Sequence, residues 1–202
     1  MRPRVLQITA ASALPEPVLL ARIAALAALP AAARARFAVQ LRDPELPPRA
    51  LLALGARLRE ATRAIGAGLV VNDRVDLALA LGADGVHLGR RSMAVADARA
   101  LLPAGAWVSR SCHAVDEVVR AAGEGADAVL LSPIFASPGK GPPLGLEALR
   151  AARAALEGQA RAPLLVALGG VDASNAGACF NAGAGAVAGI RASLAEVLAE
   201  EG

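Results

Sequence analysis

The sequence predicts an α/β protein, a single-domain (β/α)8 TIM barrel spanning residues 1–202. Eight short apolar runs are separated by longer segments with helical spacing, which is the pattern of βα units around a parallel sheet. The runs are almost continuously apolar, as expected for strands buried on both faces. Eight such units in 202 residues fit a barrel near the lower end of its usual size.

Four strands are expected in the first half of the chain, each a mostly apolar run bounded by polar or turn-forming residues. They are Val5–Thr9, Phe37–Arg42, Leu69–Asn72 and Gly85–Leu88. The segments between them are rich in Ala, Leu and Arg at helical spacing. Helices are therefore expected at Pro17–Ala28, Arg49–Ile65 and Arg74–Leu81.

The second half repeats this alternation. Strands are expected at Trp107–Ser111, Ala128–Ser132, Leu164–Leu168 and Ala186–Ile190, with helices at Val115–Glu124 and Leu146–Leu156. A further helix is expected to begin at Arg191, directly after the last strand.

A short motif recurs where a helix is expected to end and a strand to begin. Its copies are Gly82-Ala-Asp-Gly-Val, Gly125-Ala-Asp-Ala-Val and Gly183-Ala-Gly-Ala-Val. The first glycine suits a left-handed helix cap, and the valine enters the buried strand. An open doubly wound sheet is the alternative fold, but the first strand–helix turn, QITAASALPEP, lacks the GxGxxG phosphate loop of such sheets.

Composition excludes several classes of protein. A hydrophobic fraction of 55% is too high for a disordered chain. Charged residues interrupt every apolar stretch before the ~18 residues of a membrane helix, so no membrane partner is expected. The two cysteines can form neither a disulfide framework nor a CxxC metal site. A cytoplasmic protein is the expectation.

The small excess of basic over acidic residues does not indicate a nucleic-acid partner. The net charge is only +3, no basic run occurs, and the chain has no Tyr, one Trp and three Phe on which bases could stack. Arginine replaces lysine throughout, with 20 arginines and one lysine, Lys140. A single ammonium in a Gly/Pro-rich loop suits a phosphate or pyrophosphate oxygen, although an incidental surface lysine is the alternative.

In a barrel, functional residues gather where the strands end. Gly169 and Gly170 follow the seventh strand, and the helix expected at Arg191 follows the eighth. Backbone N–H groups and a helix dipole at this point predict a phosphate site. The alternative is that the glycines serve only tight packing at the rim.

Several polar residues follow the other strands. Asp73, beside Asn72, is a candidate Mg²⁺ ligand, the alternative being a helix-capping role for either residue. Arg42 is a further candidate to bind an anionic ligand at the mouth of the barrel. The alternative is an ion pair with Asp43 or Asp73. His87 and His113 can move protons near neutral pH, although for His87 a structural role is favoured. Cys112 and Cys179 are expected to be buried and unreactive.

Five segments together are similar to the thiamine-phosphate synthase/TenI superfamily. They are Val39-Gln-Leu-Arg42, VVNDRVDLALALGADGVHLG, SRSCHAVDE, PIFASPGKGPPLGLEAL and VALGGVDASNAGACFNAGAGAVAGI. They cover nearly the whole chain in order. The resemblance implies the same barrel, often paired as a homodimer.

The resemblance also implies a reaction. Pyrophosphate would leave a hydroxymethylpyrimidine pyrophosphate, and the nitrogen of a thiazole phosphate would trap the resulting pyrimidine cation to form thiamine phosphate. By position, Gln40, Asn72 and Ser111 would contact the pyrimidine. Pyrophosphate would be held by Arg42, Asn72 and Lys140, and Mg²⁺ by Asp73. Ser137 would face the thiazole, whose phosphate would lie at Gly170, Ile190 and Arg191.

The sequence departs from the synthase pattern at several points. QLRDP replaces QLREK, so Pro44 stands where a second cation is usual. Ser92 stands where a second metal carboxylate is usual, which implies weak Mg²⁺ binding, and Arg90 or Arg91 would then neutralise pyrophosphate directly. Ser137 and Gly139 replace two threonines, and Arg191 replaces a serine.

Two alternatives stay open. A TenI-type thiazole tautomerase would isomerise a thiazole phosphate without metal, with His113 as its base, because the usual histidine before Phe135 is Pro133 here. The second alternative is a barrel that binds the thiazole phosphate without catalysing a reaction.

Overall fold

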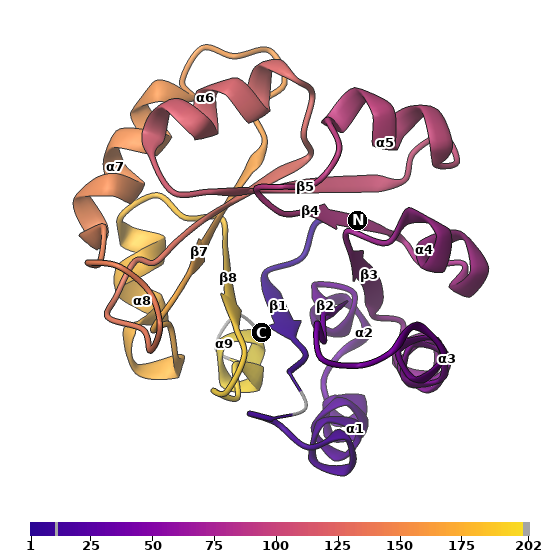
Figure 1. The fold of residues 1–202 in the computed structure, drawn as a ribbon. Helices are drawn as coiled ribbons and strands as arrows, with labels where there is room; N and C mark the ends of the chain where they lie inside the picture. The colour runs from indigo at the N-terminus through magenta and orange to yellow at the C-terminus, as the bar shows by residue number, and fades with distance from the viewer. Residues whose placement is uncertain (11, 200–202) are drawn as a thin grey trace.

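The computed structural model describes residues 1–10 and 12–199, which form a closed barrel of eight parallel strands in chain order (Figure 1). The strands are β1 (Val5–Ile8), β2 (Phe37–Leu41), β3 (Gly68–Asn72), β4 (Gly85–Leu88), β5 (Trp107–Cys112), β6 (Ala128–Leu131), β7 (Leu164–Leu168) and β8 (Ala186–Gly189). Val5 of β1 pairs with Val187 of β8, which closes the ring. The predicted barrel is confirmed, and each strand boundary differs from the expected one by at most one residue.

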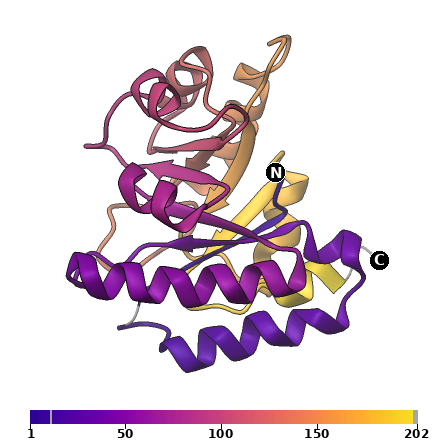
Figure 2. The ribbon, with the colours of Figure 1, turned by 90° about the vertical axis from the view of Figure 1, so that its right-hand side faces the viewer.

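Helices surround the strands (Figure 1). They are α1 (Glu16–Ala25), a 3₁₀ turn (Leu26–Ala28), α2 (Ala31–Arg34), α3 (Pro48–Ile65), α4 (Val75–Leu81), α5 (Val95–Leu101), α6 (Val115–Gly123), α7 (Gly145–Ala155), α8 (Ala173–Asn181) and α9 (Ala195–Ala199). The long α3 lies beside α1 on the outside of the barrel (Figure 2).

The prediction that a helix begins at Arg191 is wrong. Arg191 and Ala192 form a bend, and the helix begins only at Ala195. The chain first turns over the end of β8 to bury Leu194, which is 1% exposed and whose Cδ1 lies close to Gly189. A five-residue helix that begins this late offers no dipole beside Arg191.

Successive side chains along each strand point alternately into the barrel and toward the helices, so the protein has two hydrophobic cores. Small and branched side chains fill the barrel, among them Leu6, Val70, Leu130 and Val166, with Trp107 toward the end at which the strands begin. A larger apolar layer lies between the barrel and the helices. Because the inside is filled by side chains, the chemistry is confined to the ends of the strands.

The recurring motif has a structural role in two of its copies. Gly82, Gly125 and Gly183 all adopt positive φ angles, as expected for left-handed caps. The Asp84 carboxylate accepts the backbone N–H of Leu69 at 2.7 Å, and the Asp127 carboxylate that of Val108 at 2.9 Å. Each carboxylate therefore fixes the start of the preceding strand.

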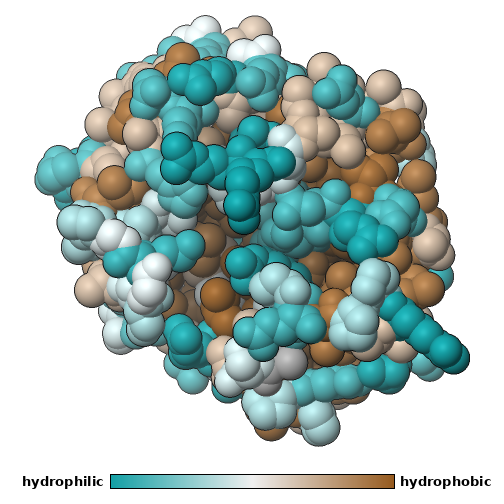
Figure 3. Space-filling view, viewed as in Figure 1, coloured by the Kyte–Doolittle hydropathy of each residue, from teal (hydrophilic) through white to brown (hydrophobic). Residues whose placement is uncertain are grey.

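Hydrophilic side chains form a band across the middle of the face in Figure 3, and hydrophobic ones are scattered around it. Val18, Leu79 and Leu101, which are exposed large hydrophobic residues, lie on three different helices. Among the residues described, no helix combines the length and apolarity needed to cross a membrane.

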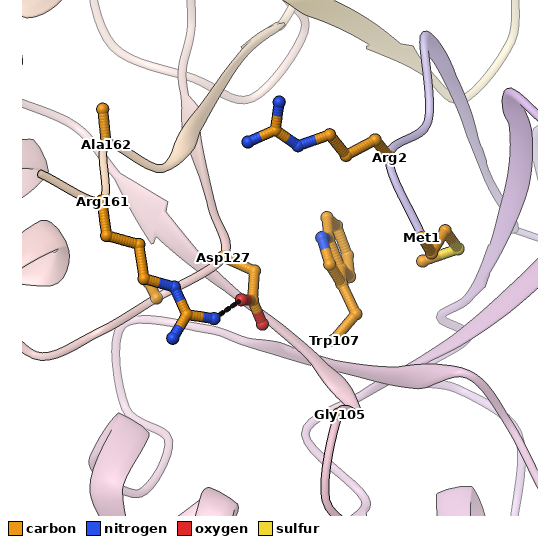
Figure 4. A pocket seen from close by; sticks show the side chains of 8 residues that line it. Met1, Arg2, Gly105, Trp107, Asp127, Arg161 and Ala162 are labelled. Atoms are coloured by element: carbon orange, nitrogen blue, oxygen red, sulfur yellow. Dashed lines mark hydrogen bonds and ion pairs between the residues drawn. The ribbon is translucent and has the colours of Figure 1, made fainter.

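A cavity of about 180 Å³ lies at the end of the barrel where the strands begin, beside Trp107, Asp127 and Arg161 (Figure 4). Asp127 accepts from Arg161 at 2.9 Å, from Arg99 at 2.7 Å and from the N–H of Val108. Both oxygens of this carboxylate therefore accept hydrogen bonds from within the fold.

Candidate active site

Polar side chains occupy one half of the barrel interior near the carboxyl ends of the strands. They come from four neighbouring strands, β2 to β5, and are Gln40, Asn72, His87, Ser109 and Ser111. The facing strands carry apolar residues there, including Ile8, Leu130, Leu168 and Ile190. The structure thus brings together Gln40, Asn72 and Ser111, as the sequence predicted.

Gln40 has an unused acceptor. Its Nε2 donates to Oδ1 of Asn72 at 3.0 Å, which fixes the amide orientation. Its Oε1 is buried and has no hydrogen-bond partner among the residues described, although Gln40 is only 1% exposed. A buried amide oxygen without a donor costs roughly 1–3 kcal/mol, so a ligand N–H group at this position would be strongly favoured.

His87 joins two serines. Nδ1 lies 2.9 Å from Oγ of Ser109, and Nε2 lies 2.9 Å from Oγ of Ser111. Ser109 also donates to the carbonyl of Val86 at 3.4 Å, so it accepts from Nδ1–H and leaves Nε2 to accept the Ser111 hydroxyl proton. Burial lowers the pKa of His87 to about 4, so its ring is neutral at physiological pH. The favoured structural role of His87 is thereby supported.

Asp73 has a strained backbone. Its φ is 59°, and the N–H of Arg74 donates across it to the carbonyl of Asn72 at 2.7 Å, which forms a tight γ-turn. The turn directs the carboxylate toward the end of β4. There it accepts from the N–H of Gly89 at 3.0 Å, from Nδ2 of Asn72 at 2.7 Å and from the Ser92 hydroxyl.

The capping role considered for Asn72 and Asp73 is wrong. The N-cap residue of α4 is Arg74, which makes no side-chain capping bond. Asn72 instead faces the barrel and Asp73 faces the turn after β4. Among the described residues no group of three or more His, Cys, Asp or Glu could hold a metal ion.

Two exposed cations stand at the rim. None of the ion pairs found between described residues involves Arg42, and its pairing with Asp43 or Asp73 stays a prediction. Its backbone is held by Thr9, whose hydroxyl lies 2.8 Å from the Arg42 N–H. Lys140 lies in the loop between β6 and α7, after Gly139 at a φ of 71°, and its N–H donates to the carbonyl of Ser137 at 3.2 Å.

Gly169 and Gly170 are crowded by the loop after β6. A Cβ on Gly169 would lie 2.7 Å from Cα of Pro133, and one on Gly170 would lie 2.7 Å from the carbonyl oxygen of Ala136. Both glycines have positive φ angles. Tight packing therefore accounts for both of them, and their binding of phosphate stays a prediction.

Gln7 and Asn175, which the sequence reasoning missed, stiffen the neighbouring rim. Nε2 of Gln7 donates to the carbonyls of Gly189 at 3.1 Å and Ile190 at 2.8 Å. Nδ2 of Asn175 donates to the carbonyl of Gly170 at 2.9 Å. A polar residue inside a buried strand was the available signal for Gln7.

His113 lies at the end of β5. Its Nδ1 donates to the carbonyl of Ser132 at 2.8 Å, which places the remaining lone pair on Nε2. Glu117, also missed, accepts the backbone N–H of His113 at 2.6 Å. Ser137 lies on the following loop and donates to the carbonyl of Phe135 at 3.3 Å.

Both cysteines are buried and free. Burial raises the pKa of Cys112 to about 12 and that of Cys179 to about 11. The expectation that they are unreactive is supported, because the thiolate is the reactive form.

The comparisons with known proteins agree with one another. The family model for thiamine monophosphate synthase matches residues 18–193. The chain belongs to this family. A thiamine-phosphate synthase of Methanoculleus marisnigri is 47% identical over 169 residues, which cover 82% of this chain and 78% of that protein. One of Gloeobacter violaceus is 45% identical over 78% of this chain and 45% of its own length.

Solved structures support the same family. Thiamine phosphate pyrophosphorylase from Pyrococcus furiosus has a TM-score of 0.77 and 28% identity, covering 98% of this chain and 92% of that one. The resemblance drawn from the motifs is confirmed. As a member of the thiamine monophosphate synthase family, the chain is a transferase of thiamine biosynthesis.

Proposed function

We propose that this barrel joins hydroxymethylpyrimidine pyrophosphate to thiazole phosphate and releases pyrophosphate, forming thiamine phosphate. The observation that carries the proposal is the unpartnered Oε1 of Gln40 inside a barrel whose relatives are thiamine-phosphate synthases. An aminopyrimidine offers the exocyclic N–H donor that this buried oxygen lacks. Asn72 and Ser111 supply further polar groups beside it.

A neutral His87 suits the proposed cationic intermediate. When pyrophosphate departs, positive charge develops on the pyrimidine methylene, and an imidazolium nearby would oppose it. With a pKa of about 4, His87 carries no charge at neutral pH. The ring still accepts the Ser111 proton, so the Ser111 oxygen presents lone pairs to the substrate.

The charged ends of the substrates would lie at the rim. Arg42 and Lys140, on opposite sides of the mouth along the β2 and β6 loops, would hold the departing pyrophosphate as charge-assisted donors. Ser137 would face the thiazole. The phosphate of the thiazole substrate would lie at Gly169, Gly170, Ile190 and Arg191. Gly170 is exposed there, and its N–H has no protein acceptor among the described residues.

Asp73 fits Mg²⁺ as one protein ligand. Three donors already occupy about three of the four lone-pair positions on its carboxylate, which leaves room for one metal bond. Mg²⁺ commonly takes one or two carboxylates together with substrate phosphates, and there it would neutralise pyrophosphate charge. Because Ser92 supplies no second carboxylate, we propose that the ion is bound weakly.

A two-substrate assay tests the proposal. Purified protein is incubated with both phosphorylated substrates, with Mg²⁺ or with a chelator, and thiamine phosphate and pyrophosphate are quantified. Equal amounts of both products support the synthase. Isomerisation of a thiazole carboxylate phosphate without metal, suppressed by His113→Ala, would instead favour the tautomerase, which the names of the relatives do not favour.

We further propose that residues 1–202 act as one domain, in the cytoplasm, as a homodimer. Light scattering during size-exclusion chromatography measures the mass in solution. A mass near 40 kDa, twice the chain mass of 20.2 kDa, supports the pair, and a mass near that of one chain contradicts it.

A further inference from the structure

Ser109 lies inside the barrel, deeper than Ser111 and further from the mouth. It is 0% exposed and pairs with His87 across the β4–β5 ladder. Ser111 is two residues further along β5, so its side chain points to the same face of the strand. His87 contacts both hydroxyls, Ser109 through Nδ1 and Ser111 through Nε2, each at 2.9 Å. Because only Ser111 is partly exposed, a ligand can reach Ser111 but not Ser109.

The neutral ring of His87 has two tautomers, and they give Ser111 opposite roles. Burial lowers the pKa of His87 to about 4, so the ring carries one proton at neutral pH. With this proton on Nδ1, Nε2 accepts the Ser111 hydroxyl proton, and the Ser111 oxygen offers lone pairs to a ligand. With the proton on Nε2, Nε2 donates to the Ser111 oxygen, and the Ser111 hydroxyl can donate to a ligand.

Ser109 decides between the tautomers through the carbonyl of Val86. This carbonyl can only accept, and it lies 3.4 Å from the Ser109 hydroxyl. With the proton on Nδ1, Ser109 accepts from His87 and donates to Val86 while Ser111 donates to Nε2, so three hydrogen bonds form. With the proton on Nε2, Ser109 donates to Nδ1 and loses the bond to Val86, so only two form. Buried polar groups favour the state with more hydrogen bonds.

We propose that Ser109 is a positioning residue for substrate recognition: it makes Ser111 an acceptor, so that the pocket selects an aminopyrimidine over the corresponding oxopyrimidine. The inference rests on the proposed function, in which the pyrimidine lies beside Ser111 and Gln40. Oε1 of Gln40 is a second buried acceptor without a donor among the described residues. An amino group offers N–H donors to such oxygens, whereas an oxo group at the same ring position offers no donor and repels them.

Nitrogen NMR of protein labelled in its histidine rings tests the tautomer. The chain has two histidines, His87 and His113. In wild type the His87 proton is expected on Nδ1. Ser109→Ala leaves Nδ1 without a partner, and because a buried unpaired N–H is less tolerated than an unpaired acceptor, the proton should move to Nε2. His113, whose Nδ1 donates to the carbonyl of Ser132, is the internal reference and should not change.

Calorimetric titration tests the consequence for recognition. The probes are the unphosphorylated aminopyrimidine alcohol and its oxo counterpart, which have no leaving group. Wild type is expected to bind the amino probe more tightly, and Ser109→Ala is expected to reduce this preference about tenfold, or ~1.4 kcal/mol. Thr62→Val removes a buried hydroxyl that bonds the carbonyl of Arg59 within α3, and is the control expected to keep the preference within twofold.

Two results would overturn the inference: a His87 proton on the same nitrogen in wild type and Ser109→Ala, or a preference within twofold of wild type in that variant. If Ser109→Ala does not fold, Ser109→Cys, whose sulfur is a weak acceptor, is judged by the same two readouts. If thiamine phosphate forms in the two-substrate assay but neither readout changes, only this inference fails. If none forms and both readouts change as expected, the proposed reaction fails and the role of Ser109 in binding stands.

Discussion

At the scale of single residues, the site depends on groups held in one protonation state by burial. His87 sits among Ser109 and Ser111 in the barrel interior, and desolvation keeps its ring neutral. Gln40 keeps a buried oxygen without a donor. In the proposed reaction, a neutral, oriented surface of this kind would surround the developing cation without opposing it, and the rim would supply positive charge for the departing anion.

The lowered pKa of His87 makes stability depend on pH. A folded-state pKa of about 4 lies below the ordinary value of 6.5, so the unfolded chain binds the proton first and stability is lost as the pH falls between these values. Wild type should lose on the order of 3 kcal/mol from this group by pH 4. Urea unfolding at pH 7 and pH 4 measures this loss, and His87→Asn should show a correspondingly smaller difference. Equal losses in both proteins would contradict the assignment.

Lys140 is predicted to act on the leaving pyrophosphate. Lys140→Ala should lower kcat/KM for the pyrimidine pyrophosphate by roughly 10- to 100-fold, the effect of one lost hydrogen bond to a charged group. Lys140→Arg keeps the charge and should recover part of the rate. Steady-state kinetics measure both, and an unchanged rate in Lys140→Ala would remove Lys140 from the site.

At the scale of elements, the loops after the strands carry several of the candidate site residues, and contacts between neighbouring loops and helices hold these loops in place. The γ-turn at Asp73 directs a carboxylate to the turn after β4. The loop after β6 packs against Gly169 and Gly170, and Asn175 of α8 holds the carbonyl of Gly170. Neighbouring loops therefore fix one another.

Gly170→Ala should disturb two loops at once. Its new Cβ would lie 2.7 Å from the carbonyl oxygen of Ala136 and 2.8 Å from Cβ of Phe135. Gly158, at a φ of 77° and with open space around it, is the matched control for the positive φ. Gly158→Ala should cost about 1 kcal/mol from backbone strain alone, and Gly170→Ala roughly 1–3 kcal/mol more from overpacking. Urea unfolding measures both, and equal costs would show that the loop yields freely.

Ser92→Asp places a second carboxylate beside Asp73. Mg²⁺ should then bind more tightly, and turnover at saturating Mg²⁺ should rise, because two carboxylates hold the ion with the substrate phosphates. Turnover of the variant and of wild type is compared across a Mg²⁺ titration. The prediction is contradicted if chelator inactivates the wild-type enzyme and Ser92→Asp leaves turnover unchanged. In that case the single carboxylate of Asp73 already binds the ion well.

At the scale of the whole molecule, the barrel could be predicted because its signals are local. Each strand is a buried apolar run, and the capping glycines at positions 82, 125 and 183 mark where three of them begin. The membership of Gln40, Asn72 and Ser111 in one site also follows from parallel strands that end together. The helix expected at Arg191 failed because burial of Leu194 decided the path of the chain after β8.

Side-chain partners across the barrel could not be predicted. Ser109 and Ser111 bond one histidine from a neighbouring strand, which depends on the β4–β5 register rather than on either segment alone. Such features follow from tertiary packing.

The central claim is that the neutral barrel interior and its cationic rim join the two halves of thiamine phosphate. Its most direct measurement follows thiamine phosphate and pyrophosphate by chromatography after mixing protein with both phosphorylated substrates. The account predicts that the two products appear in equal amounts, and that Gln40→Leu, which removes the buried acceptor, sharply slows their formation. Absence of thiamine phosphate at saturating substrates, with and without Mg²⁺, would contradict it.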